Sequence, residues 1–155
     1  MAKSLISLVI AVLLAASAAF ALFSCGAYDH VETVRQYTPF TDEGYGFTRT
    51  ADFGSVAAKY VDSPEWKHRT AGGTDYVDFK GKLKGSGEDV LITFKVTPLE
   101  EKDMFLVSTH SVEWGDESGG ADEAAVLLYY MYYAYNSGFD TVDELLNTFD
   151  PDAVG

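Results

Sequence analysis

One cysteine and three histidines are the side chains of this sequence best suited to bind a metal ion, carry a covalent group or transfer a proton. Cys25 is the only thiol, so the chain cannot form an internal disulfide in any compartment. His30, His68 and His110 do not have the i, i+4 spacing of two metal ligands on a helix. An acid–base or metal site remains an alternative if His68 and His110 meet across a sheet, but ordinary strand histidines are the simpler interpretation. We therefore expect no catalytic residue, no metal ion and no cofactor.

The segment before Cys25 indicates how the thiol is used. Lys3 is followed by a stretch without charge from residue 5 to residue 22, in which small residues gather at positions 15–19. A positive, then apolar, then small segment is typical of a secretory signal. The sequence therefore predicts a signal peptide over residues 1–24.

The end of this segment together with the cysteine, Leu22-Phe-Ser-Cys25, is similar to the lipobox of bacterial lipoproteins. An aliphatic residue stands three places before the cysteine and a small residue directly before it, although Phe23 is bulkier than is usual between them. In such a site the thiol carries diacylglycerol, and cleavage before the cysteine leaves an N-terminus that two or three acyl chains hold at the membrane. We expect lipid attachment at Cys25, followed by a short tether over residues 25–30.

Two other fates of the segment stay open. Ala19-Phe-Ala21 is an A-x-A site, and cleavage there would release a secreted protein with a free Cys25. Alternatively, the apolar stretch is long enough to remain as an uncleaved membrane helix. All three interpretations place residues 31–150 outside the cytoplasm. Lipid attachment at Cys25 would hold them at the membrane.

The charge of the chain is strongly negative. There are 24 acidic and 11 basic residues, for a net charge of −13, and no lysine or arginine follows Lys102. A charge of this sign repels phosphate backbones and argues against nucleic acid as a partner. Apolar residues make up 47% of the chain, which is enough for one packed core. We expect a single domain over residues 31–150 and a frayed tail over residues 151–155.

Hydrophobic periodicity predicts the elements of this domain. Apolar residues of residues 51–62 fall at i, i+3, i+4, i+7 and i+8, which indicates a helix that Pro64 ends. After Trp66 the period changes to two, which predicts strands over residues 67–70, 75–83, 89–97 and 104–114. Capping signals predict helices over residues 122–136 and 141–149. Short loops make antiparallel neighbours, so we expect an α+β fold: an antiparallel sheet of about four strands, covered on one face by helices and preceded by the N-terminal signal helix.

Residues 126–136, VLLYYMYYAYN, form the least ordinary stretch of the domain. On a helix their aromatic side chains surround most of the circumference, whereas a helix that covers a sheet usually has a polar outer side. Core packing beneath the last helix is one explanation. The other is a contact surface, since tyrosine has an apolar ring and a hydroxyl that can stay hydrated. The candidate partner-binding residues are Tyr129, Tyr130, Tyr132, Tyr133 and Tyr135.

Two charged clusters have ordinary explanations beside functional ones. Four carboxylates surround a Gly-Gly pair, but their order does not match a calcium-binding EF-hand loop, and a hydrated loop before a helix explains them equally well. Three alternate lysines share a strand face, where they would serve as solvent cover or meet anionic lipid headgroups. The carboxylates are Asp116, Glu117, Asp122 and Glu123, and the lysines are Lys80, Lys82 and Lys84.

Several short motifs resemble those of small bacterial envelope lipoproteins. They are Val31-x-x-Val34-Arg35, Ser63-Pro-Glu-Trp66, the strand at residues 76–81 and the strand at residues 93–96. The layout is also similar to β-lactamase-inhibitor-like and SmpA/OmlA-like domains, over roughly residues 31–114. The resemblance implies a non-enzymatic binding module whose partners are the membrane, through its lipid, and an envelope protein or cell-wall component. It assigns no functional residue. An extracytoplasmic enzyme with a site near His68 and His110, or a membrane-anchored structural domain, are the alternatives.

Overall fold

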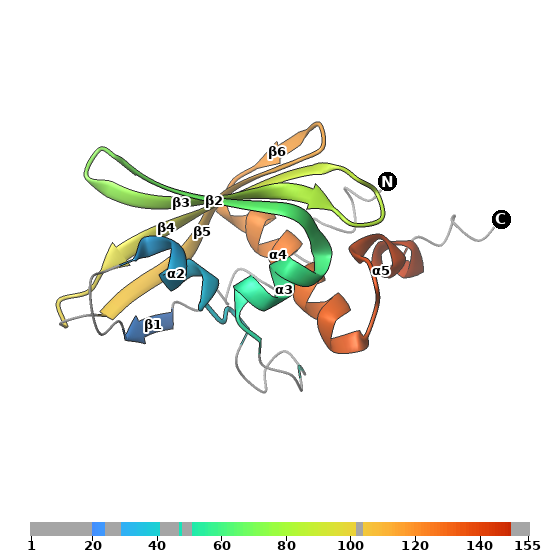
Figure 1. The fold of residues 1–155 in the computed structure, drawn as a ribbon, viewed down its shortest axis with the longest axis horizontal. Helices are drawn as coiled ribbons and strands as arrows, with labels where there is room; N and C mark the ends of the chain where they lie inside the picture. The colour runs from blue at the N-terminus through green and yellow to red at the C-terminus, as the bar shows by residue number, and fades with distance from the viewer. Residues whose placement is uncertain (1–19, 24–28, 41–46, 48–50, 102–103, 150–155) are drawn as a thin grey trace.

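The computed structural model describes residues 20–23, 29–40, 47, 51–101 and 104–149 (Figure 1). Its elements in chain order are β1 (Phe20–Phe23), α2 (His30–Arg35), α3 (Phe53–Tyr60), β2 (Val61–Ala71), β3 (Thr74–Leu83), β4 (Asp89–Pro98), β5 (Met104–Trp114), β6 (Glu117–Gly119), α4 (Ala121–Ser137) and α5 (Val142–Phe149). The strands form one antiparallel sheet in the order β1-β5-β4-β3-β2, and β6 pairs with residues 112–114 at the end of β5. The predicted α+β class and antiparallel sheet are confirmed.

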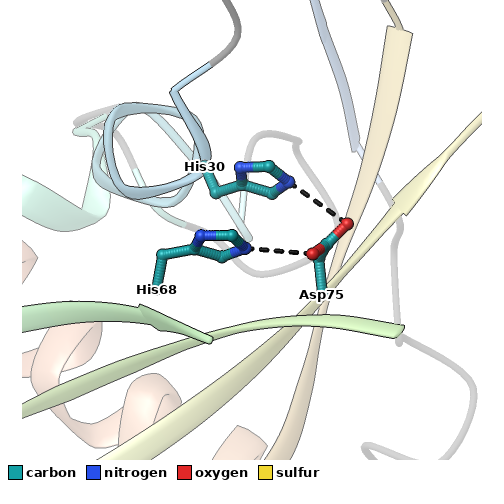
Figure 2. A group of neighbouring side chains, drawn as sticks. All are labelled: His30, His68 and Asp75. Atoms are coloured by element: carbon teal, nitrogen blue, oxygen red, sulfur yellow. Dashed lines mark hydrogen bonds and ion pairs between the residues drawn. The ribbon is translucent and has the colours of Figure 1, made fainter. Parts of the chain in front are cut away.

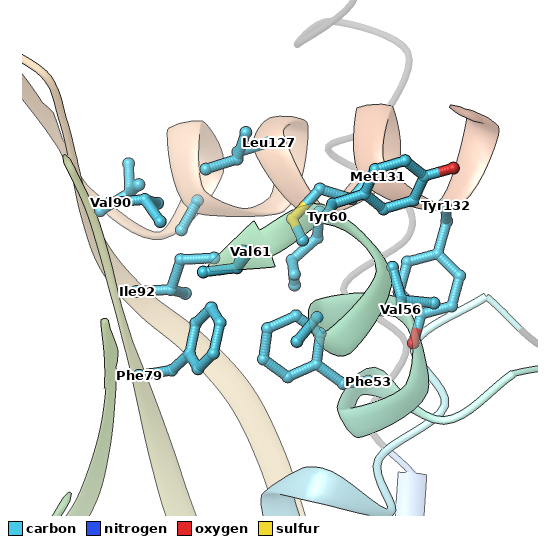
Figure 3. Packing of buried hydrophobic residues seen from close by; sticks show 14 of the residues in the cluster. Phe53, Val56, Tyr60, Val61, Phe79, Val90, Ile92, Leu127, Met131 and Tyr132 are labelled. Carbon is cyan, nitrogen blue, oxygen red and sulfur yellow. The ribbon is translucent and has the colours of Figure 1, made fainter. Parts of the chain in front are cut away.

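The helices lie on one side of this sheet (Figure 1). Alternation along the strands gives that side an apolar surface, because successive side chains of a strand point to opposite faces. Figure 3 shows Phe79 and Ile92 of the sheet facing Phe53 of α3, with Leu127 and Met131 of α4 above them. All five side chains are at most 1% exposed. Burial between the sheet and the helices is therefore the main stabilising contribution to the fold.

The junction between α3 and β2 differs from the sequence prediction. The helix ends at Tyr60, and the strand begins at the next residue and continues through Pro64. Pairing with β3 steps from Asp62↔Lys82 to Glu65↔Lys80, so Ser63 and Pro64 form a bulge opposite Gly81. A proline in a bulge costs no ladder hydrogen bond, which is why Pro64 did not end the strand.

Gly81 makes this bulge possible. A β-carbon at this position would collide with Val61 and with the carbonyl oxygen of Asp62. Close approach of the two backbones therefore requires a residue without a side chain at the point where β2 bends.

The N-terminal predictions fall mostly outside the described residues. Residues 1–19 and 24–28 lie outside the described part of the chain, and they include most of the predicted signal peptide and Cys25. The predicted tail at residues 151–155 lies outside it as well. Residues 20–23 form β1, whose Phe20 pairs with Val107 of β5. Within the described part of the chain, no helix has the length and apolar character needed to cross a bilayer.

Candidate functional site

A cluster of metal-ligating side chains forms where the β2–β3 hairpin meets α2. Gly72 and Gly73 connect the two strands with φ values of +58° and +76°, the conformation of a two-residue type I′ turn. This turn sets the register, so Thr70 lies directly opposite Asp75. His68 lies two residues before Thr70 and therefore points to the same, helix-covered face of the sheet. The hairpin thus places one imidazole, one hydroxyl and one carboxylate side by side.

Helix α2 brings the second imidazole. Asp29 is the N-cap of this helix, and its Oδ1 accepts hydrogen bonds from the backbone N–H groups of Val31, at 2.9 Å, and Glu32, at 3.2 Å. His30 is the first residue of α2 and lies over the hairpin (Figure 2). The cap therefore holds the first turn of α2, and with it the backbone of His30, in place.

The two imidazoles approach the same carboxylate (Figure 2). His30 Nε2 lies 3.2 Å from Asp75 Oδ2, and His68 Nε2 lies 3.0 Å from Asp75 Oδ1. The two rings stack with centroids 3.9 Å apart and planes inclined by 10°. Since an ionised carboxylate only accepts hydrogen bonds, each neutral imidazole meets it through an Nε2–H group.

The carboxylate at the centre of this cluster is held in its ionised form. Thr70 Oγ1 donates a 2.7 Å hydrogen bond to Asp75 Oδ1. This hydrogen bond, followed by those from His68 and His30, lowers the pKa of the Asp75 carboxyl to about 2. The side chains of His30, His68 and Asp75 are 17%, 36% and 29% exposed, so solvent and small ions reach them. Among the described residues they are the one group of three side chains that could hold a metal ion.

The structure does not bring His68 and His110 together. They lie on β2 and β5, which β3 and β4 separate. Three strand spacings amount to roughly 14 Å between their backbones. His110 also points to the opposite face of the sheet, where its ring lies 5.0 Å from that of Tyr76. The site predicted from these two histidines is therefore wrong, and the partner of His68 is His30.

The face of the sheet away from the helices carries a second group, the open-face row, made of Arg69, Tyr76, Asp78 and His110. The Arg69 guanidinium lies 4.6 Å from the centre of the Tyr76 ring, and the centre of the His110 ring lies 5.0 Å from it. Arg69 Nε also donates to Asp78 Oδ2 at 2.8 Å. Asp78 Oδ1 in turn accepts a 2.8 Å hydrogen bond from Thr93. The row is thus held in place by contacts across four strands.

The tyrosines of α4 are divided between core and surface. Tyr132 is 1% exposed and Tyr130 is 8% exposed, so both belong to the core. The prediction that these two side chains contact a partner is therefore corrected, because both rings are buried and the Tyr132 hydroxyl donates to the Ala51 carbonyl oxygen. Tyr129, Tyr133 and Tyr135 are half-buried against the same core.

The charged clusters have local partners. Glu123 accepts a 2.8 Å hydrogen bond from the Gly120 N–H and so serves as part of the N-terminal cap of α4. Lys80 and Lys82 pair with Glu65 and Asp89 across the sheet. The third lysine of the predicted stripe, Lys84, instead donates to the carbonyl oxygens at the end of α3. These contacts within the chain account for Glu123 and for the three lysines.

Comparisons with known proteins found no matching family model, curated protein or solved structure. The resemblance to envelope lipoproteins accordingly stays a prediction that depends on the short motifs of the sequence. The function of the chain is therefore inferred from the geometry of its own side chains.

Part of the histidine–aspartate cluster could have been found from the sequence. The Gly72-Gly73 pair between two alternating stretches indicates a two-residue turn, and counting back from it places His68 and Asp75 on one face. No signal in the sequence indicates that His30 joins them, because its position depends on how α2 packs.

Proposed function

We propose that this chain is an envelope lipoprotein: a non-enzymatic binding domain, fastened outside the cytoplasm through Cys25, whose partner contacts the open face of the sheet. The lipobox-like sequence at Cys25 supports the anchor. The open-face row supports the binding role, and it is the observation on which this proposal depends most.

The open-face row suits a contact surface for two physical reasons. Arginine and tyrosine are the residue types most enriched at the energetic centres of interfaces, because both combine apolar area with hydrogen-bonding groups. In addition, the contacts of Arg69 with Tyr76 and Asp78 hold these side chains in one arrangement before any partner arrives. Less side-chain entropy is then lost on binding.

Charge indicates the class of partner. In a chain with a net charge of −13, five of the 11 basic residues lie on this one face. They are Lys67, Arg69, Lys80, Lys82 and Lys95. A shallow depression of about 390 Å³ lies on the same face, and its charged lining residues are Lys80, Lys82, Asp62, Glu65, Asp89 and Glu113. Three of the five cations pair with carboxylates of the same face, so the surface carries both signs of charge. A cell-wall component that carries amino groups as well as carboxylate or phosphate groups fits such a surface, since each kind of group finds a partner of opposite charge there.

Co-sedimentation with purified, protein-free bacterial cell walls tests this proposal. The full chain with Cys25→Ala is used, so that no lipid contributes to sedimentation. Arg69→Ala and Tyr76→Ala should each weaken binding by about tenfold, the usual effect of removing a central interface residue.

Arg35→Ala is the matched control. It removes the same charge from α2, on the other side of the sheet, where Arg35 makes an exposed ion pair with Glu32. Loss of binding in this variant as well would reveal non-specific charge attraction and contradict the proposal. Binding to an envelope protein but not to cell walls would replace the proposed partner class with the other one.

A further inference from the structure

We propose that His30, His68 and Asp75 form a binding site for a divalent transition-metal ion, with Zn²⁺ as the best-fitting example. The site lies on the helix-covered side of the sheet, so it is separate from the open-face row and does not depend on the function proposed for it. Sequence spacing predicts no such site, because its ligands come from α2 and from both strands of the β2–β3 hairpin.

The spacing of the ligand atoms fits such an ion. Bonds of about 2.0–2.2 Å from a tetrahedral Zn²⁺ place neighbouring ligand atoms about 3.4 Å apart. In the structure the two nitrogen–oxygen separations are 3.2 Å and 3.0 Å, and all three ligand atoms lie within 4.8 Å of one another. Both Nε2 atoms already point at the carboxylate (Figure 2). Because the two rings stack with planes inclined by only 10°, they would tilt toward each other at Nε2, so that both lone pairs meet one ion.

Binding requires the Nε2 lone pair of each imidazole, so it changes the tautomer of a neutral ring. Without the ion, each neutral ring directs an Nε2–H group at Asp75. With the ion, the Nε2 lone pair must face the metal, so the proton of each ring moves to Nδ1 through exchange with water. No proton is lost from a neutral ring, and the carboxylate is ionised in both states.

The types of ligand select the kind of metal. Two imidazole nitrogens and one carboxylate oxygen suit Zn²⁺ and its neighbours in the first transition series. Ca²⁺ and Mg²⁺ prefer oxygen ligands alone. Three protein ligands leave a fourth position of a tetrahedral ion for water, and the partial exposure of all three side chains provides the path of entry.

Groups around the ligands hold them in place. Thr70 donates to Asp75 Oδ1, which orients the carboxylate as supporting residues do in metal sites. Asp29 caps α2 and so fixes the start of the helix that carries His30. Since the ion would join α2 to the hairpin, its binding should stabilise the folded protein.

Titration with Zn²⁺ by calorimetry tests the proposal. The full chain is prepared with Cys25→Ser, without a histidine tag and after treatment with a chelator, so that no thiol or added imidazole competes. We expect one equivalent of Zn²⁺ to bind and the melting temperature to rise. Co²⁺ should give the visible absorption of a four-coordinate site with nitrogen and oxygen ligands, and Ca²⁺ should have no effect.

Variants distinguish this site from other binding. His30→Ala, His68→Ala and Asp75→Asn should each weaken Zn²⁺ binding at least about tenfold, because the loss of a residue that merely supports a ligand already costs about 10- to 100-fold in affinity. His110→Ala is the matched control, since it removes a histidine from the opposite face and should leave the affinity unchanged. Asp75→Asn keeps an oxygen that accepts the Thr70 hydrogen bond, so it preserves the fold if an alanine variant does not.

Two results would overturn the proposal. One is the absence of Zn²⁺ binding to a folded wild-type chain. The other is binding of equal affinity in wild type and in folded Asp75→Asn. In either case the three side chains would be only a hydrogen-bonded contact between α2 and the hairpin. Cell-wall binding tests the open-face row separately, so failure of one proposal leaves the other standing.

Discussion

The Tyr132 hydroxyl donates a 3.1 Å hydrogen bond to the carbonyl oxygen of Ala51, 81 residues away in the chain. The Tyr132 ring is 1% exposed, and its burial raises the pKa of the hydroxyl far above its ordinary value. Tyr132 therefore joins α4, the tyrosine-rich helix, to the segment that precedes α3. This tyrosine contributes to the stability of the fold and not to a partner surface.

Substitution of Tyr132 should destabilise the protein. Tyr132→Ala removes a buried aromatic ring and should lower the free energy of unfolding by about 3–5 kcal/mol. Tyr132→Phe removes only the hydrogen bond to Ala51 and should cost about 1–2 kcal/mol. Urea unfolding measures both, with the half-buried Tyr135→Phe as control. Unchanged stability in Tyr132→Ala would contradict the placement of this ring in the core.

Tyr60 should make the fold sensitive to alkali. Its hydroxyl donates a 3.0 Å hydrogen bond to the Phe139 carbonyl oxygen. Burial, together with the charges of Asp140 and Glu144 and the neighbouring Tyr135, raises its pKa from 10.0 to about 12. The folded state then holds this proton more tightly than the unfolded state, so stability is fully present below pH 10 and falls as pH rises toward 12.

Unfolding at a series of pH values tests this sign. The free energy of unfolding of wild type should fall between pH 10 and 12, and more steeply than that of Tyr60→Phe, which has no proton to lose. Some slope should remain in the variant, because the pKa of Tyr132 is raised as well. Equal slopes in the two proteins would show that Tyr60 ionises as freely when folded as when unfolded.

Gly81 should be intolerant of even a small side chain. Gly81→Ala places a methyl group against Val61 and the backbone of Asp62, so the bulge around Pro64 must shift. We expect a loss of about 1–3 kcal/mol in the free energy of unfolding, as is usual for overpacking. Lys80→Ala, at the preceding residue, removes only an exposed ion pair with Glu65 and should cost less than about 1 kcal/mol. Similar losses in both variants would contradict the close approach at Gly81.

Processing at Cys25 should be visible as a change in mass. Wild type extracted from membranes of a bacterial host should lack residues 1–24 and carry acyl chains, whereas Cys25→Ala should carry none. An uncut wild type without lipid would support the uncleaved helical anchor. A lipid-free form cut after residue 21 would support secretion.

The same processing should change the edge of the sheet. Cleavage before Cys25 removes β1, which pairs with residues 104–107 of β5. Backbone groups that face β1 would then be open to water, so amide hydrogens of this stretch should exchange faster in the mature protein than in the uncut Cys25→Ala chain. Exchange in residues 112–114, which pair with β4 and β6, serves as the internal control. Equal exchange at 104–107 in both forms would show that β1 does not protect this edge.

The sequence determined the elements of this fold because their signals are local. Alternation within β3, β4 and β5, the 3.6-residue period of α3 and the signals at the ends of α4 all depend on neighbours a few residues apart. The same reasoning began the first strand of the hairpin too late, at residue 67, because local rules treat Pro64 as a break between elements. The strand continues there because Gly81, on another strand, allows the backbone to bulge.

Only the tertiary structure decided which distant side chains meet. The pattern of α4 left open whether Tyr132 was core or surface, since that depends on what packs above the helix. The hairpin turn could place His68 beside Asp75, but His30 reaches them through the packing of α2, and His110 is excluded by the order and facing of the strands. Periodicity specifies the direction of a side chain on its own element. The contacts between elements depend on how the hydrophobic core assembles. The candidate metal site and the open-face row both consist of such contacts, so only the tertiary structure shows them.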